Sequence, residues 1–167
     1  FTVESIPPNR TVDGGNTIRL HDGSFVCGLK PGSDGTGENY LEKILDLTTG
    51  SQLHRFPLID RKYLHLDMAL GRIGDSGYLV FESAFENGLA SLEGSPVLEK
   101  EIIPIATEDA ERFACNGITI GKTFITGKIS GSLIDSIERL GYRAITLELS
   151  ESHKAGGGLK CLTLPLE

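Results

Sequence analysis

The sequence has no tryptophan, a single methionine and only three cysteines among its 167 residues. The cysteines, Cys27, Cys115 and Cys161, are odd in number and too far apart for a Cys-x-x-Cys pair. A disulfide framework is therefore not expected, no metal-ligand spacing is present, and no metal or cofactor is predicted. This cysteine usage favours a reducing compartment, which for this chain predicts the cytoplasm. No apolar run approaches the roughly 20 residues of a membrane helix.

Positive charge is also scarce. Lys and Arg total 16 against 23 Asp and Glu, so the formal net charge is −7. Nucleic acids and anionic membranes bind to basic surfaces, so neither is an expected partner, and a small cationic ligand suits this charge better. With 39% hydrophobic and 23% charged residues, the composition is that of a globular chain, which excludes a disordered protein and predicts one domain.

A pattern of elements, rather than of residue identities, repeats about every fifty residues. Each copy reads strand, turn, strand, helix, strand, and the copies cover about residues 11–60, 61–107 and 113–150. β-branched and aromatic runs bounded by Gly and Asp predict the strands. The segment 158–165 stands where a fourth copy would begin, and we expect it to be a strand that closes a ring onto an upstream unit. The sequence thus predicts an α/β domain built by radial repetition. The chain begins with Phe rather than Met, so we expect that either a tag or a substantial part of the protein was removed upstream. The final strand without a partner indicates that N-terminal units are missing.

The helices are predicted from apolar residues at helical spacing. They fall at 37–47, around 87–92 and at 130–141. The last has the clearest ends, because Ser130 or Ser132 can cap its start and Gly141 follows its final apolar residue.

Polar residues open the three units. Asp13, His65 and Asn116 stand about fifty residues apart, and equivalent positions of a radial repeat meet near the centre. His65 and Asp67 are two residues apart in an expected strand, where they would face the same side. A carboxylate beside an imidazole favours the charged form of the histidine; a purely structural His–Asp pair is the alternative. His21, His54 and His153 lie in polar stretches and are expected to be solvated.

Cys161 lies near the C-terminus, after a glycine run that includes Gly157 and Gly158. Glycines let the backbone approach a ligand closely, and Lys154 and Lys160 would favour a thiolate if they lie near it. A lone cysteine is more often a small buried hydrophobe, and we expect that of Cys27 and Cys115. Asp13 likewise begins a turn-forming Asp-Gly-Gly. The combination carries more weight: a cysteine nucleophile needs a base, and a cationic substrate needs carboxylates.

Four segments, TVDGGNTI, LHLDMAL, ACNGI and ESHKAGGGLKCLTLPL, occur in an order and spacing that resemble the guanidine-modifying enzymes of the pentein superfamily. These include dimethylarginine dimethylaminohydrolase, arginine deiminase and the amidinotransferases. The resemblance runs from about Val12 to Leu166 and implies the C-terminal three-fifths of a five-unit α/β propeller, with about three units present. It also implies an enzyme that cleaves a C–N bond of a guanidino substrate, either arginine or a methylated arginine.

The resemblance assigns the site residues by position. It makes Cys161 the nucleophile, His65 the acid and base, and Asp13 and Asp67 the carboxylates that hold the guanidinium. We count Asn116, Gly157 and Gly158 with the substrate-binding residues. In the implied reaction Cys161 attacks the guanidinium carbon and His65 protonates the leaving amine. Water then releases a ureido product, such as citrulline, from the covalent thiouronium.

The sequence departs from the family pattern in ways that leave alternatives open. Gly32 stands where the bacterial hydrolases commonly have an arginine for the amino-acid end of the substrate, and Asp13 stands where they often have glutamate. The family's first part supplies a further aspartate and covering loops, so we expect an open ring and an incomplete pocket, with a missing N-terminal portion or a second chain, or a homo-oligomer, as partner. An amidinotransferase with the same Cys and His, or a non-catalytic pentein-type binding domain, remains an alternative. A cysteine peptidase is disfavoured by the order of Cys and His.

Overall fold

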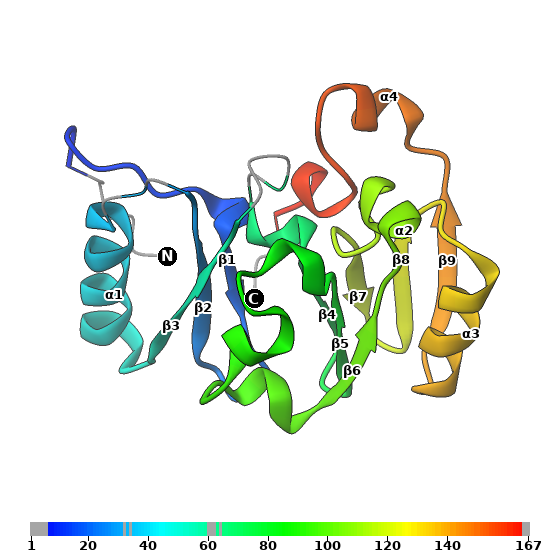
Figure 1. Cartoon of the computed structure of the whole chain (residues 1–167), viewed down its shortest axis with the longest axis horizontal. Helices are drawn as coiled ribbons and strands as arrows, with labels where there is room; N and C mark the ends of the chain where they lie inside the picture. The colour runs from blue at the N-terminus through cyan, green and yellow to red at the C-terminus, as the bar shows by residue number, and fades with distance from the viewer. Residues whose placement is uncertain (1–6, 32, 34, 60–62, 64, 165–167) are drawn as a thin grey trace.

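A computed structural model describes residues 7–31, 33, 35–59, 63 and 65–164 of the chain. Three sheets of three strands follow one another along the sequence (Figure 1). Their strands are β1 (Thr17–Arg19), β2 (Phe25–Leu29) and β3 (Leu53–Pro57); β4 (Leu70–Ile73), β5 (Gly77–Val80) and β6 (Glu101–Pro104); and β7 (Ile118–Ile120), β8 (Thr123–Gly127) and β9 (Arg143–Leu147). Gly32, which stands at the position where the resembling family commonly has an arginine, lies outside the described residues.

Each sheet has the same topology. An antiparallel hairpin comes first, and a third strand then returns parallel to its second strand. In the first sheet, Thr17 pairs with Cys27 across the hairpin, and Val26 pairs with His54 in the parallel ladder. A parallel return needs a crossover, which is why a helical segment separates the second and third strands. The expected order of strands within a unit is therefore found three times.

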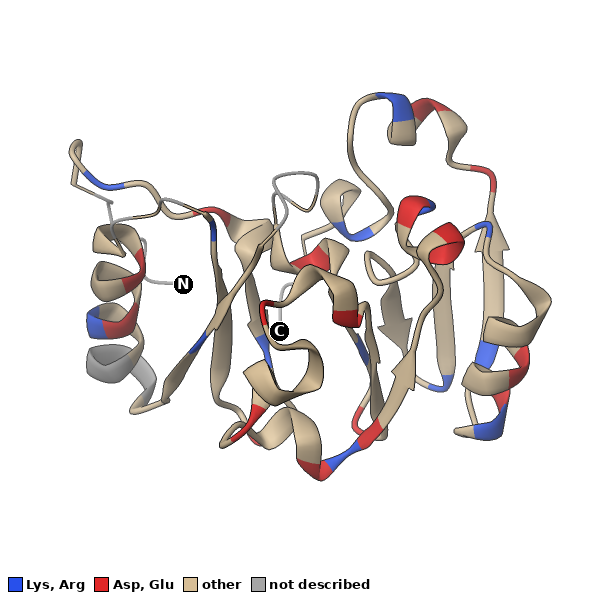
Figure 2. Cartoon of the chain, viewed as in Figure 1, with Lys and Arg blue, Asp and Glu red and all other residues tan. Residues whose placement is uncertain are grey.

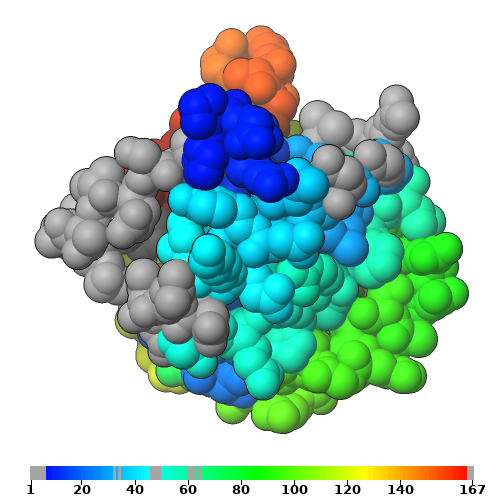
Figure 3. Space-filling model, turned by 90° about the vertical axis from the view of Figure 1, so that its left-hand side faces the viewer, coloured from blue at the N-terminus to red at the C-terminus, as the bar shows by residue number. Residues whose placement is uncertain are grey.

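The crossovers differ between units. α1 (Thr36–Thr49) and α3 (Gly131–Arg139) are α-helices, as expected, and lie at opposite outer sides of the molecule in Figure 1. Ser130 caps α3, its Oγ accepting a hydrogen bond from the Leu133 N–H at 3.3 Å. In the space-filling view from the α1 side, residues of the first unit, in cyan, occupy the middle of the face, and residues of the second unit, in green, lie at its lower right (Figure 3).

The helix expected around 87–92 is not an α-helix. The second crossover consists of three 3-10 turns, η3 (Glu82–Ala84), η4 (Gly88–Leu92) and η5 (Pro96–Glu99). Gly88 and Gly94 both have positive φ, and Pro96 cannot donate to a preceding turn, so no α-helix continues through this segment. Two short helices that the sequence did not predict, α2 (Thr107–Glu111) and α4 (Ser150–Lys154), lie in the connections before β7 and after β9.

One hydrophobic core joins the three units. Its largest fully buried side chains come from all three, and include Leu20, Tyr78 and Phe124. Cys27 and Cys115 are each 1% exposed, which confirms their expected place in the core. Neighbouring units also meet through hydrogen bonds. Arg72 on β4 donates to the carbonyl of Leu20, and the Gly74 N–H donates to Thr119 Oγ1 at 3.1 Å. The units therefore form a continuous body rather than separate modules.

The strand expected at 158–165 is not formed in its described part. Lys160–Leu162 make a 3-10 turn, η6, and no described strand pairs with this segment. A strand exists only through hydrogen bonds to a neighbour, and none of the three sheets offers this segment one. Leu162 and Leu164 are 64% and 81% exposed, so their apolar side chains face outward without a covering element among the described residues.

The charge distribution agrees with the acidic composition. In Figure 2, Lys and Arg occur singly among the Asp and Glu residues and do not gather on one element. Within the described ranges, no helix is long and apolar enough to cross a bilayer.

Candidate active site

Three short 3-10 turns lie together at one end of the sheets and carry the residues singled out in the sequence. They are η1 (Gly14–Asn16), η2 (Leu66–Met68) and η6, seen at the upper centre of Figure 1. Asp13 precedes η1, His65 precedes η2, and Cys161 lies within η6. The three turns belong to different parts of the repeat but lie at the same end of the sheets. Asp13 and Cys161, about 150 positions apart in the sequence, therefore reach the same end of the molecule.

Asp13 and His65 are in direct contact. His65 Nε2 lies 3.6 Å from Asp13 Oδ2, and both side chains are about one-third exposed. The same carboxylate oxygen also accepts a hydrogen bond from Lys30 Nζ. The hydrogen bond and charge of Lys30, with a smaller effect of His65, hold the pKa of Asp13 below its usual value, although partial burial acts in the opposite direction. Asp13 is therefore a carboxylate at neutral pH.

Asp67 lies beside this pair, but not for the reason that the sequence suggested. Residues 66–68 form a 3-10 turn rather than a strand, so alternation along a strand does not bring His65 and Asp67 together. They are gathered around Gly15 instead: a Cβ added there would lie 3.1 Å from both Asp67 Oδ2 and His65 Nδ1. Asp67 is only 2% exposed. Its Oδ2 accepts a hydrogen bond from Lys160 Nζ at 3.2 Å, whereas its Oδ1 has no partner among the described residues.

Cys161 is exposed, and hydrogen bonds to the buried Asn116 fix the turn that carries it. The Oδ1 atom of Asn116 accepts the Cys161 N–H at 3.2 Å, and its backbone carbonyl accepts the Lys160 N–H at 3.0 Å. Asn116 is fully buried, and its Nδ2 has no hydrogen-bond partner in the described part of the chain. This geometry makes Asn116 a support of the cysteine turn, whereas a role in binding substrate stays a prediction.

The glycines before Cys161 are required by close packing. Gly158 is buried, and a Cβ at this position would lie 2.8 Å from Asn116 Oδ1 and 3.0 Å from Phe113 Cβ. Gly157 lies against Cys161 itself, because a Cβ at this position would lie 3.1 Å from the Cβ atom of Cys161. Both glycines therefore let the chain pass close to Asn116 and to the cysteine.

The first unit contains a second asparagine in the corresponding role. Asn16 is 5% exposed; its Oδ1 accepts the Leu66 N–H at 3.1 Å, and its Nδ2 donates to the Gly28 carbonyl. Asn16 thus holds the turn after His65, as Asn116 holds the turn of Cys161. The sequence analysis missed both Asn16 and Lys30. Asn16 ends the Asp-Gly-Gly-Asn segment and was open to notice there, whereas no local pattern marks Lys30.

The remaining histidines are more constrained than expected. His21 has a side chain 11% exposed, and its Nδ1 lies 3.1 Å from the Tyr78 hydroxyl. His153 stacks on Phe113 with ring centroids 4.9 Å apart, and burial lowers its pKa. Phe113 has a φ of 61°, a conformation that is costly for an aromatic residue, and so this turn just before Asn116 is strained.

The lysines flanking Cys161 each have a carboxylate partner. Lys154 pairs with Glu151 at 2.6 Å on the exposed α4, and Lys160 pairs with Asp67. No cluster of three His, Cys, Asp or Glu side chains that suits a metal ion occurs among the residues that the structure describes.

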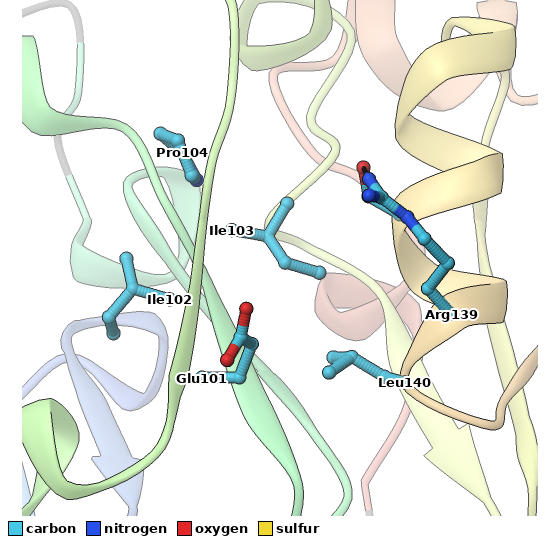
Figure 4. Close-up of a pocket in the computed structure, with 7 residues that line it drawn as sticks. Glu101, Ile102, Ile103, Pro104, Arg139 and Leu140 are labelled. Atoms are coloured by element: carbon cyan, nitrogen blue, oxygen red, sulfur yellow. Dashed lines mark hydrogen bonds between the residues drawn. The ribbon is translucent and has the colours of Figure 1, made fainter.

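A hollow of about 500 Å³ lies between β6 and α3, lined on one side by Glu101 and Ile103 and on the other by Arg139 and Leu140 (Figure 4). None of the site residues lines it. A second, smaller hollow is lined by Asp13 and Asn16, which belong to the candidate site.

Comparison with known proteins identifies relatives over nearly the whole chain. The bifunctional arginine dihydrolase/ornithine cyclodeaminase AgrE of Nostoc sp. is 31% identical over 166 residues, which are 98% of this chain and 23% of that protein. The N(G),N(G)-dimethylarginine dimethylaminohydrolase of Mycobacterium tuberculosis is 28% identical over 109 residues, 65% of this chain and 35% of that protein. The chain thus spans about a quarter to a third of the length of these relatives. No protein-family model matches it.

Solved structures give the same result for the fold. The N-terminal domain of ArgZ, an arginine dihydrolase of cyanobacteria solved with its product, superposes with a TM-score of 0.87 at 28% identity, covering 98% of this chain and 59% of that one. Two further structures of that domain match with the same TM-score and identity, each over 98% of this chain and 60% of theirs. One is a cysteine-to-serine variant bound to substrate, and the other is covalently bonded to a reaction intermediate. The expected α/β architecture is confirmed.

Proposed function

We propose that this chain, a relative of the arginine dihydrolases and dimethylarginine dimethylaminohydrolases with the pentein-type fold, carries the nucleophile and the acid–base group of a guanidino hydrolase. The observation that carries the proposal is the meeting of Asp13, His65 and Asp67 with the turn of Cys161 at one end of three repeated units. These residue types match what the reaction requires: a nucleophile, a group that moves protons, and carboxylates for a cation.

In the proposed reaction, Asp13 and Asp67 bind the planar guanidinium and orient its central carbon toward Cys161. The Cys161 thiolate forms a C–S bond with this carbon. His65, in its charged form beside Asp13, gives a proton to the nitrogen that leaves as an amine or ammonia. Neutral His65 then takes a proton from water, which attacks the same carbon. The C–S bond breaks, and a ureido product and the thiolate are released.

The cysteine role has support from the cyanobacterial relative, because that domain was trapped with its substrate as a cysteine-to-serine variant. The orientation of Cys161 by Asn116 fits a residue that must be held in place for attack. Arginine or a methylated arginine is the proposed substrate, and the cytoplasm the proposed location. The rest of the pocket is proposed to come from an N-terminal portion or a second chain, and self-association of the chain remains a prediction.

The test is a colorimetric assay for ureido product, with arginine, methylated arginines and agmatine offered in parallel. It is run on this chain and on the whole natural protein that contains it. Cys161→Ser is expected to abolish product formation while circular dichroism shows an intact fold. Cys27→Ala is the matched control, because Cys27 is buried in β2 and takes no part in the reaction.

Three outcomes separate the hypotheses. Product from the whole protein, lost in Cys161→Ser but not in Cys27→Ala, supports the hydrolase. Absence of product, with amidino transfer from arginine to an added amine, assigns a transferase instead. Absence of both reactions in the whole protein leaves the non-catalytic binding domain.

A further inference from the structure

Each of the two carboxylates proposed to hold the guanidinium already holds an ammonium group of its own chain. Lys30 Nζ donates to Asp13 Oδ2, and Lys160 Nζ donates to Asp67 Oδ2 at 3.2 Å. Lys30 directly follows β2 in the first unit, whereas Lys160 begins η6, so the two lysines reach the site from opposite ends of the chain.

The burial of Asp67 explains why a resident cation is needed. Asp67 is 2% exposed, and a carboxylate removed from water without a counter-ion is strongly unfavourable. The side chain of Lys160 is 29% exposed, so it reaches the buried carboxylate from the solvent side. Lys160 therefore supplies the counter-ion of Asp67, and its partly exposed side chain adjoins solvent into which it could be displaced.

The contact leaves half of the Asp67 carboxylate unused. Lys160 occupies Oδ2, while Oδ1 is buried and has no partner in the described residues. An ammonium is a point charge, whereas a guanidinium presents two parallel N–H groups that match both oxygens of a carboxylate. A guanidinium thus gains a hydrogen bond that Lys160 does not make. An alkylammonium offers Asp67 nothing that Lys160 does not already supply.

We propose that Lys30 and Lys160 are specificity-determining residues: resident ammonium groups that occupy Asp13 and Asp67 until a guanidinium displaces them, and that thereby exclude simple amines from the site. The inference rests on the proposed function, because it assumes that these two carboxylates receive a guanidino group.

The first experiment measures binding without turnover. Thermal unfolding of the whole natural protein is followed with methylguanidinium chloride or methylammonium chloride at equal ionic strength. The parent protein is expected to gain stability with methylguanidinium only. Lys160→Met is expected to unfold at a lower temperature without ligand, because Asp67 loses its counter-ion, and to gain stability from both ions. Lys154→Met, which breaks an ion pair on exposed α4, is the matched control and should behave as the parent.

The second experiment measures steady-state kinetics with the guanidino substrate. Lys160→Met is expected to lower KM by about tenfold, since the substrate no longer competes with a resident cation, and to make alkylamines competitive inhibitors. Lys160→Arg is expected to act in the opposite direction and raise KM, because a resident guanidinium itself takes both oxygens of Asp67. Lys30→Met tests the Asp13 side in the same way.

Lys160→Arg keeps the positive charge, so it maintains the test even if Lys160→Met fails to fold. Equal stabilisation of the parent by the two ions, or no stabilisation by either ion, overturns the proposal. So does a Lys160→Arg variant whose KM equals that of the parent. A protein that binds methylguanidinium selectively but forms no ureido product would retire the proposed reaction and leave the role of the lysines standing.

Discussion

Two adjacent glycines allow a sharp test of how closely the candidate site is packed. Gly15 faces His65 and Asp67, whereas a Cβ on Gly14 would meet nothing within 4 Å. We therefore predict that Gly15→Ala lowers activity, whereas Gly14→Ala, one residue away in the same turn, leaves it nearly unchanged. Neither glycine has a positive φ, so backbone strain does not confuse the comparison.

The size of the effect follows from the contacts. An alanine Cβ at Gly15 would lie 3.1 Å from Asp67 Oδ2 and from His65 Nδ1, short of ordinary van der Waals contact at 3.4–4 Å. Both side chains must then move by a few tenths of an ångström. Overpacking of this kind costs about 1 kcal/mol, and the reduced freedom of the unfolded chain returns about 0.4–1 kcal/mol. The free energy of unfolding should thus change by less than about 1 kcal/mol.

Activity should change more, since a displacement of about 1 Å in a catalytic group can cost about 100-fold in rate. On the proposed function, a shift of a few tenths of an ångström in His65, the proposed acid–base group, and in Asp67, a proposed guanidinium carboxylate, predicts a loss of about tenfold in kcat/KM. Gly14→Ala should keep kcat/KM within about twofold and be as stable as the parent or slightly more so.

The measurements are urea denaturation and initial rates of ureido-product formation in the whole natural protein. Full activity in Gly15→Ala would show that His65 and Asp67 do not need this spacing. An equal loss of activity in Gly14→Ala would show that the turn, and not the contact, matters.

Three further predictions concern other parts of the structure. A thiol reagent should modify Cys161 rapidly in the native chain, and Cys27 and Cys115 only after unfolding. Burial raises the pKa of Cys27 to about 11 and raises the pKa of Cys115 further, so neither buried thiol forms a thiolate readily. Mass spectrometry of the labelled peptides checks this order. Ser130→Ala should lower the free energy of unfolding by about 1–2 kcal/mol in urea titrations, because it removes the N-cap of α3 and the 2.6 Å hydrogen bond to the buried Asp109. Asp13→Asn should be less stable than the parent at neutral pH, by under about 1 kcal/mol because the ion pair with Lys30 is partly exposed. Folding lowers the pKa of Asp13, so its contribution to stability is complete above the unfolded value of 3.8 and is lost as pH falls through the folded value. The difference in stability should therefore vanish in acid. Equal stability of the two proteins at neutral pH would count against the Lys30 contact.

Much of the architecture was predictable because it is encoded locally. The hairpins follow from β-branched runs bounded by glycine turns, and α3 follows from its apolar spacing and the Ser130 cap. Burial of Cys27 was predictable from its place within the apolar strand 24–29. These features depend on residues that are close together in the sequence, so they can be predicted from a single sequence without knowledge of the tertiary structure.

The sequence predicted part of the clustering of the candidate residues, whereas their roles in binding and catalysis stay predictions. The repeat placed Asp13 and His65 at equivalent positions, and they do meet. The prediction of a strand around His65 was wrong. His65 itself has an extended backbone, but a 3-10 turn follows it, and a pattern of only three residues does not distinguish a strand from such a turn. Lys30 and Asn16 act through partners 17 and 50 residues away, and no periodic pattern encodes such contacts. The segment 158–165 was expected to pair with an upstream unit; among the described residues it forms the turn η6 and pairs with no strand.

The long-range character of the site contacts bears on the order in which the protein assembles. Each sheet is completed by strands close together in sequence, whereas the contacts that hold the turns of the candidate site join residues 45, 50 and 93 positions apart. Closing longer loops costs more chain entropy, so local pairings form earlier than distant ones. The chain can therefore acquire nearly all of its secondary structure while Cys161 is still far from His65. On the proposed function, activity would then appear late in folding and be lost early in unfolding, so that it would report on the folding of the whole chain rather than of any one unit.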